Sequence, residues 1–371
     1  MGKDTSFVCK RHYMILKLMY TASGSGKEVL CGDEDRMLTL NDILEARDRI
    51  SPYIERTPLK ESHTLSNRLG AKVYLKLEMF QTTGAFKIRG AFNKMLSLSP
   101  EEKNRGVVAV SGGNHAQAVA YAASKLGIKA TVFMARNTPE NYIEATEHYG
   151  AQVVLTSDIA EAFKLAAERQ AYGEVMIHPY ADKQVMAGQG TIGLEILEDL
   201  PQVTDVIISI GGGGLISGVA TAIKSQKPNV RIWGVETAGA DSMSQALKAG
   251  HPIELPAITS IAKTLGAPSV SEDTLAITRK LVESVTVVSD KEAFQALEFL
   301  LERAKVLTEP AASCTLAAAE RLRSAFTPQS TLVLLLCGGN VSLADLCHYR
   351  QMFSVEDKKH RPQLEHHEIS L

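Results

Sequence analysis

The sequence predicts an α/β protein of two domains, each a twisted, mostly parallel sheet flanked by helices. Short apolar, β-rich runs alternate with helical patterns along most of the chain, which is typical of parallel strands joined by crossover helices. Several of these runs end in glycine-rich turns, where α/β proteins usually bind ligands. A chain of 371 residues also exceeds the size of one ordinary hydrophobic core.

The expected strands can be placed by their apolar runs. They are residues 73–76, 106–110, 130–134, 152–155, 205–210, 231–235, 285–288 and 331–337. We assign residues 39–105 and 182–350 to a large domain and residues 106–181 to a small domain. Residues 1–38 are expected to be a peripheral, mobile N-terminal segment, and residues 351–371 a polar C-terminal tail whose histidines are more often solvated than metal-bound.

Composition excludes several classes of protein. The formal net charge of −2 gives no overall field for nucleic acid or an anionic membrane. The longest apolar run near the start, Tyr13 to Tyr20, is interrupted by Lys17 and is too short for a membrane span. The five cysteines are scattered and form no CxxC pair, so we expect a reducing, cytoplasmic location. The opening Met1 to Ser6 fits a myristoylation pattern, which short sequences often match by chance.

A run of four glycines carries the first functional signal. Gly211, Gly212, Gly213 and Gly214 follow an apolar strand and precede a helical pattern. Without side chains, their backbone N–H groups can close around an anion at the start of a helix, so a phosphate site is favoured over a simple tight turn. Gly212, Gly214 and Gly218 also imitate a loose dinucleotide fingerprint, with Glu236 at a suitable distance for a ribose. This loop alone does not decide between the two ligands.

A lysine at the start of a helix favours a ligand that reacts with an amine over a dinucleotide. Lys87 lies between the apolar residues Phe86 and Ile88, at the mouth of a predicted helix. A lone lysine is more often a surface residue. Burial, however, would lower its pKa toward that of a nucleophilic amine, and the helix dipole disfavours a permanent cation at this end.

Two further strand ends carry glycine turns. Ser111, Gly112 and Gly113 precede Asn114 and His115, which open an alanine-rich helix, and such a turn can bind a carboxylate. His115 is either a base or a structural residue. Cys337 ends an apolar strand before a second Gly-Gly-Asn turn, a position where a free cysteine is usually a small buried hydrophobic residue.

Together these four segments resemble the tryptophan-synthase-β-like (fold-type II) family of pyridoxal-phosphate (PLP) enzymes, within it the serine/threonine dehydratases and serine racemase. The similarity covers about residues 39–349 and rests on the phrase from Thr83 to Ala91 and on the order of the four motifs. The resemblance implies that PLP lies in the cleft between the domains. It also implies a small amino-acid substrate and a homo-oligomer, a dimer or tetramer.

The resemblance assigns a role to each matching residue. Lys87 is implied to be the Schiff-base lysine, which also takes the substrate α-proton. The cofactor would contact Phe86, Lys87, Asn114, Gly211, Gly212, Gly213, Gly214, Leu215, Glu309 and Cys337, with the glycines and the Leu215 amide at the phosphate. The substrate carboxylate would contact Ser111, Gly112, Asn114 and His115. The implied reaction removes water and ammonia from a β-hydroxy amino acid to give a 2-keto acid.

Two positions depart from the pattern of the family. Serine racemase carries a second serine where this chain has Gly112, so we expect little racemase activity. A divalent-cation loop, for Mg²⁺ or another ion, matches at Glu236 and at the carbonyl of Ala240, but its third, usually acidic ligand aligns with Ser242. Hard cations require several oxygen ligands, so this site stays an open expectation.

Five alternatives remain at this level. The same scaffold supports a racemase, a β-replacing enzyme, or a dehydratase of 3-hydroxyaspartate or phenylserine, although the lysine motif of cysteine synthases is absent. The 211–218 loop alone would suit a nucleotide-dependent oxidoreductase, and a catalytically idle carrier of PLP or another ligand is the last alternative. The short remainder after residue 350 predicts no regulatory domain of the biosynthetic threonine-deaminase type, and therefore a catabolic-type enzyme.

Overall fold

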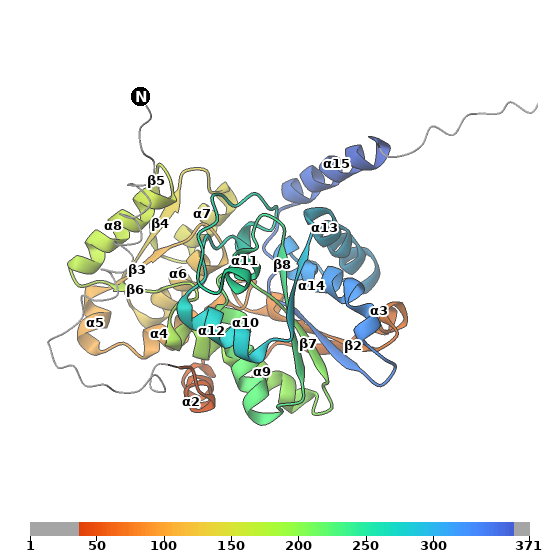
Figure 1. Ribbon diagram of the computed structural model, residues 1–371. Coiled ribbons are helices and arrows are strands. Elements are labelled where there is room, and N and C mark those ends of the chain that lie inside the picture. Colours follow the sequence, from red (N-terminus) through yellow and green to blue (C-terminus); the bar gives the residue numbers. More distant parts are fainter. Residues whose placement is uncertain (1–36, 360–371) are drawn as a thin grey trace, which may run out of the picture.

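The computed structural model describes residues 37–359, which form two sheets with helices packed around them (Figure 1). The N-terminal segment up to residue 36, with the pattern at Gly2, and the tail histidines His360, His366 and His367 lie outside the described residues. In the part of the chain that is described, no helix combines the length and the apolar character needed to cross a membrane.

The larger sheet has six strands in the order β1-β2-β10-β7-β8-β9. All its neighbours pair in parallel except β1 with β2. The strands are β1 Leu59–Glu61, β2 Lys72–Leu77, β7 Asp205–Ser209, β8 Arg231–Thr237, β9 Ser284–Val288 and β10 Thr331–Leu336. β1 was not predicted because it has only three residues and none of them is buried.

The smaller sheet has four parallel strands in the order β5-β4-β3-β6. They are β3 Val107–Val110, β4 Ala130–Ala135, β5 Gln152–Thr156 and β6 Val175–Met176. The helices of this unit are α6 Asn114–Leu126, α7 Glu140–His148 and α8 Ile159–Ala171. Both sheets are dominated by parallel pairs and flanked by helices, so the predicted fold class is confirmed.

The remaining helices surround the larger sheet and join the two units. They are α2 Leu40–Ile50, α3 His63–Leu69, α4 Lys87–Leu96, α5 Pro100–Arg105, α9 Lys183–Asp199, α10 Gly214–Gln226, α11 Ser242–Ala249, α12 Glu272–Leu281, α13 Asp290–Phe299, α14 Pro310–Arg321 and α15 Leu343–Lys359. Short 3₁₀ turns cover Glu78–Phe80, Lys263–Leu265 and Arg323–Ala325, and one π turn covers Leu300–Ala304. Capping boxes at Thr39, Ser99, Ser271 and Ser289 fix where four of the helices begin.

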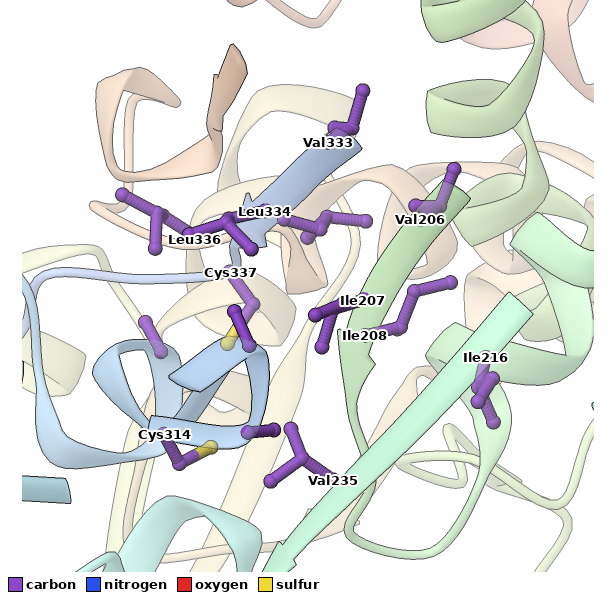
Figure 2. Close-up of a cluster of buried hydrophobic side chains, with 14 of the residues drawn as sticks. Val206, Ile207, Ile208, Ile216, Val235, Cys314, Val333, Leu334, Leu336 and Cys337 are labelled. Atoms are coloured by element: carbon purple, nitrogen blue, oxygen red, sulfur yellow. The ribbon is translucent and has the colours of Figure 1, made fainter. Parts of the chain in front are cut away.

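The centre of the larger sheet is buried on both faces. All six residues of β10 are buried, which explains why the run from Thr331 to Leu336 shows no polar alternation. Figure 2 shows Val333, Leu334 and Leu336 of β10 beside Val206, Ile207 and Ile208 of the neighbouring strand β7. Each buried leucine or isoleucine contributes about 1.5–3 kcal/mol to folding. This apolar centre supports Cys337, which lies at the end of β10.

A buried cluster of charges connects β2, α4 and α9. Arg89 of α4 is fully buried and donates to both oxygens of Glu78, at 2.8 and 2.9 Å, and to Glu195 of α9 at 2.6 Å. Lys76 of β2, also fully buried, donates to Glu195 at 2.5 Å and to the carbonyl oxygen of Thr57 at 2.7 Å. Two cations thus neutralise two carboxylates, and the cluster fixes the helix that begins at Lys87.

Candidate active site

The predicted cofactor and substrate residues line one cavity of about 320 Å³ between the two sheets. Its lining includes Phe86, Lys87, Ser111, Gly112, Asn114, His115, Gly211, Gly212, Gly213, Gly214, Leu215, Glu309 and Cys337. A surface hollow of about 370 Å³ lies elsewhere, over α13 and α14. Its arginines are already paired with its glutamates, as in Arg68–Glu320 and Arg321–Glu292, so the chemistry points to the first cavity.

Lys87 is the first residue of α4 and presents its amine to the cavity. The Nζ atom donates to the carbonyl oxygen of Pro179 at 2.7 Å. Burial lowers the pKa of this amine to about 8, although the nearby Cys337 and Glu309 act in the opposite direction. A lysine with such a pKa is unprotonated in an appreciable fraction at neutral pH, as a nucleophile or a general base requires.

The tetraglycine turn joins β7 to α10 and has no space for side chains. A Cβ atom at Gly212 would lie 2.3 Å from the ring of Tyr180, and one at Gly214 would lie 2.9 Å from the Tyr180 backbone. Gly213 has a φ of +92°, a left-handed conformation that glycine adopts readily. The turn therefore presents backbone amides at the start of a 13-residue helix, an arrangement that fits a phosphate group.

Asn114 is fixed by residues from the larger unit. Its Nδ2 atom donates to the two carboxylate oxygens of Glu309, at 2.9 and 3.1 Å, and its Oδ1 atom accepts from Asn340 at 2.7 Å. Thr264 donates to Glu309 at 2.7 Å, and burial raises the pKa of the Glu309 carboxyl. The sequence assigned the side-chain amide of Asn114 to an oxygen of the cofactor ring. In the structure its Nδ2 atom is directed at Glu309. Both carboxylate oxygens lie on the same side of Nδ2, so its second N–H remains for the cofactor.

His115 lies in the second turn of the site and is neutral at physiological pH. Burial, and to a smaller extent the nearby Lys87, lowers the pKa of its imidazole to about 3. Its Nε2 atom lies 2.7 Å from the carbonyl oxygen of Ile177, so Nε2 carries the proton, while Nδ1 is buried without a partner. The side chain therefore offers an acceptor, and a carboxylate in this turn would bind to backbone amides instead.

Gly112 lies in the same turn, beside Thr138. A Cβ atom at Gly112 would lie 2.7 Å from the Thr138 hydroxyl oxygen, so this hydroxyl occupies the space that a side chain at position 112 would need. Ser111 accepts a hydrogen bond from the amide of Gly113 at 3.2 Å, which holds the turn in shape.

Cys337 closes the cavity at the end of β10. Burial raises the pKa of its thiol well above the usual value, so the sulfur is neutral. The backbone connects it to the lysine segment, because the amide of Phe86 donates to the carbonyl oxygen of Cys337 at 3.0 Å. Lys87 and Cys337 therefore lie on adjoining, hydrogen-bonded segments.

The three residues of the expected cation loop lie outside this cavity. The carboxylate of Glu236 accepts from the backbone amides of Met243 and Ser244, each at 2.8 Å, and so serves as a cap for α11. Ala240 is buried beside it, and the Ser242 hydroxyl is buried without a hydrogen bond. Among residues 37–359 no group of three or more His, Cys, Asp or Glu side chains could hold a metal. A single carboxylate already held by two amides does not fit a divalent ion.

Several residues of the cavity were not found by the sequence analysis. They are Tyr142, His178, Pro179, Tyr180, Ser209, Thr264 and Asn340. Asn340 could have been found, since it ends the Gly-Gly-Asn turn after β10. His178 and its neighbours follow β6, a strand of two residues that has no recognisable pattern.

The fold and this cavity define a PLP enzyme of fold-type II, with an amine, an anion-binding turn and a second glycine turn around one space. The family model "Pyridoxal-phosphate dependent enzyme" matches residues 50–338. The chain belongs to this family.

Its relatives narrow the class. The chain is 44% identical to an L-threonine ammonia-lyase of Geobacter sulfurreducens, over 83% of this chain and 77% of the relative. It is 41% identical to "L-threonine dehydratase catabolic TdcB" of Staphylococcus aureus, over 83% of this chain and 90% of the relative. These relatives place the chain among the PLP-dependent dehydratases, which are lyases.

Solved structures agree with this fold. Maize serine racemase matches with a TM-score of 0.79 and 37% identity, over 87% of this chain and 99% of that one. The processed form of threonine deaminase isoform 2 from Solanum lycopersicum matches with a TM-score of 0.79 and 33% identity, over 86% of this chain and 94% of that one.

Proposed function

We propose that this enzyme converts L-threonine, L-serine or both to a 2-keto acid and ammonia by α,β-elimination. The observation that carries the proposal is the joint position of Lys87, the Gly211–Gly214 turn and the Ser111–His115 turn in one cavity. The relatives named for L-threonine, at 41–44% identity, support a β-hydroxy substrate.

The residues present fit PLP. Lys87 would hold the cofactor aldehyde through its amine, and the amides of Gly211 to Leu215 would hold the phosphate. Phe86 would pack beside the ring, Asn114 would donate to its oxygen, and Cys337 would face the ring nitrogen. When bound, PLP supplies an electron sink for negative charge at the substrate α-carbon. Glu309 holds Asn114 in place through the bonds described above.

The chain's own groups then bind the substrate and move a proton. We assign the substrate carboxylate to the turn formed by Ser111, Gly112, Asn114 and His115, which lies at the N-terminus of α6. Lys87 accepts the α-proton at Nζ, since its pKa of about 8 makes the free amine available. The neutral Cys337 thiol gives the ring nitrogen no permanent negative charge to pair with, which favours prompt loss of the β-hydroxyl.

Other parts of the proposal concern organisation. We assign residues 39–105 and 182–350 to a large domain and 106–181 to a small domain, with the cofactor between them. We also propose a cytoplasmic homo-oligomer, a dimer or tetramer. A role for Mg²⁺ at Glu236, Ala240 and Ser242 is not included, because the donor set does not fit a hard cation.

Serine racemase is the second candidate, since a solved serine racemase matches most of the chain. Gly112 disfavours it, because glycine has no side-chain proton to deliver at this position.

Product analysis tests the proposal. Purified enzyme supplied with PLP is assayed for ammonia and 2-keto acid with threonine, serine, 3-hydroxyaspartate and phenylserine, with and without Mg²⁺. We expect threonine or serine to give the highest kcat/KM, with Lys87→Ala as the inactive control. Release of neither product from threonine or from serine would overturn it, even if 3-hydroxyaspartate or phenylserine reacts.

A further inference from the structure

The segment of residues 177–180 contacts three parts of the active site: His115, Lys87 and the tetraglycine turn. It connects β6 of the smaller sheet to α9 of the larger unit. The carbonyl oxygen of Ile177 accepts from His115, and that of Pro179 accepts from Lys87, each at 2.7 Å. The ring of Tyr180 covers Gly212, and its hydroxyl donates to the carbonyl oxygen of Ser269 at 2.7 Å. The fourth residue, His178, makes no hydrogen bond to Lys87, His115 or the tetraglycine turn in the described part of the chain, and instead accepts from Tyr180 and Ala181.

The position of the proton on His178 follows from its neighbours. Its Nδ1 atom accepts from the backbone amides of Tyr180, at 3.2 Å, and Ala181, at 2.8 Å. Two amide donors at Nδ1 place the proton on Nε2. The imidazole also packs edge-on against the Tyr180 ring, with centroids 4.6 Å apart, so its orientation is fixed.

The Nε2–H group has no acceptor among residues 37–359, although His178 lines the cavity and is only partly exposed. The imidazole faces the cavity in a fixed orientation, so its N–H is preorganised for an acceptor on a bound ligand. The ring is also uncharged, because burial lowers its pKa to about 4. It therefore offers one neutral, directed donor.

We propose that His178 is a binding residue of this enzyme, whose Nε2–H donates to an oxygen atom of the bound reactants. Two oxygens qualify: one of the cofactor phosphate, since Tyr180 connects His178 to the Gly212 turn, and one of the substrate, since Lys87 lies beside Pro179. The inference rests on the proposed function only for the second of these sources.

Two substitutions distinguish the role of Nδ1 from the role of Nε2. In His178→Asn, the amide oxygen can replace Nδ1 as acceptor for the two backbone amides, but nothing reaches the position of Nε2. In His178→Gln, the longer side chain brings an N–H close to the Nε2 position. Thermal unfolding of the apoenzyme reports whether each variant is folded, and PLP affinity and steady-state kinetics report the function.

The two sources give different results. If the acceptor is the phosphate, His178→Asn weakens PLP binding to the apoenzyme about tenfold, as expected for one lost hydrogen bond. If the acceptor is on the substrate, PLP affinity is unchanged and kcat/KM falls about tenfold with saturating PLP. In both cases His178→Gln recovers most of the loss.

Two outcomes overturn the proposal. One is a folded His178→Asn enzyme that matches wild type in PLP affinity and in kcat/KM. The other is a folded His178→Gln enzyme as impaired as the asparagine variant, which would show that an N–H group at the Nε2 position does not restore binding. If His178→Asn does not fold, the glutamine variant alone decides. Because PLP affinity is measured without substrate, a failure of the proposed dehydratase activity in the wild type would be recognised separately.

Discussion

The Nζ atom of Lys87 donates to the carbonyl oxygen of Pro179 over 2.7 Å, so the candidate catalytic amine is held by the crossover between the two sheets. Its pKa of about 8, against 10.5 for an ordinary lysine, sets how it captures PLP. We expect the rate at which the apoenzyme binds PLP covalently to rise with pH, along a titration curve whose midpoint is near pH 8, because the unprotonated amine is the reactive form. Stopped-flow absorbance measures this rate.

Two variants control this experiment. The Lys87→Ala variant should show no visible imine band, and borohydride reduction should give no covalent adduct between PLP and the protein. The Lys129→Ala variant, which changes an exposed lysine, should behave as wild type. A capture midpoint at or above pH 10 would contradict the assignment.

The tetraglycine turn makes a steric prediction. Gly212→Ala should lower PLP affinity at least tenfold, because its Cβ would lie 2.3 Å from the Tyr180 ring. Gly113→Ala is the matched control in the other turn, where the new Cβ would make an ordinary contact 3.4 Å from Thr264. PLP titration of the apoenzymes measures both. Equal affinities in the two variants would mean that the Gly212 turn does not hold the phosphate.

Gly112 and Thr138 together predict the balance between elimination and racemisation. The wild type should form little D-serine from L-serine. Gly112→Ser alone should be impaired, since the new Cβ would lie 2.7 Å from the Thr138 hydroxyl. Gly112→Ser combined with Thr138→Ala has space for the serine and should raise the ratio of D-serine to 2-keto acid. Chiral chromatography measures the products, and rapid D-serine formation by the wild type would refute the prediction.

Substitution of the fully buried Arg89 should strongly lower the free energy of unfolding. Arg89→Leu leaves Glu78 and Glu195 with less compensation in a buried site, and should lower the free energy of unfolding by about 3–5 kcal/mol. The exposed Arg56, paired with Glu198 and Asp199, is the control, and Arg56→Leu should cost roughly 1 kcal/mol or less. Urea unfolding measures the difference. Similar losses of unfolding free energy in the two variants would show that the buried Arg89 cluster stabilises the fold no more than an exposed ion pair does.

The low pKa of the partly buried His178 predicts a loss of stability in acid. Its pKa is about 4 in the folded chain and 6.5 when unfolded, so between these values the unfolded chain binds the extra proton. Stability therefore falls as the pH falls through this window, by about 2 kcal/mol between pH 7 and pH 5 for this one group. His178→Asn should remove that part of the pH dependence in urea unfolding. An unchanged slope would show that the imidazole titrates normally.

The elements that the sequence predicted share one property: each is specified within a short stretch. The parallel strands are apolar runs, and the site turns are glycines directly after them, as at Gly211 and Gly112. The rule that parallel strands bring their carboxyl ends together applies within each sheet. The meeting of the Gly211 turn of the larger sheet with the Gly112 turn of the smaller sheet depends on how the two sheets pack. Features that depend on residues close together in the sequence could therefore be predicted.

The remainder depends on partners far apart in the chain. Nothing near Arg89 indicates that Glu195 neutralises it, 106 residues away. His178 follows a two-residue strand, and its role in the site depends on a ring orientation fixed by the backbone beyond it. Glu236 was expected to ligate a cation because its position matched, but helix α11 supplies amides that occupy both of its oxygens.

The Arg89 cluster has a consequence for synthesis of the chain on the ribosome. Lys76, Glu78 and Arg89 emerge early, whereas Glu195 emerges only after the whole smaller sheet. Until then two cations face one carboxylate, and enclosing them would leave a positive charge unbalanced. We therefore expect the helix that begins at Lys87 to reach its final position only after Glu195 has been synthesised, so that the PLP site is completed late in synthesis.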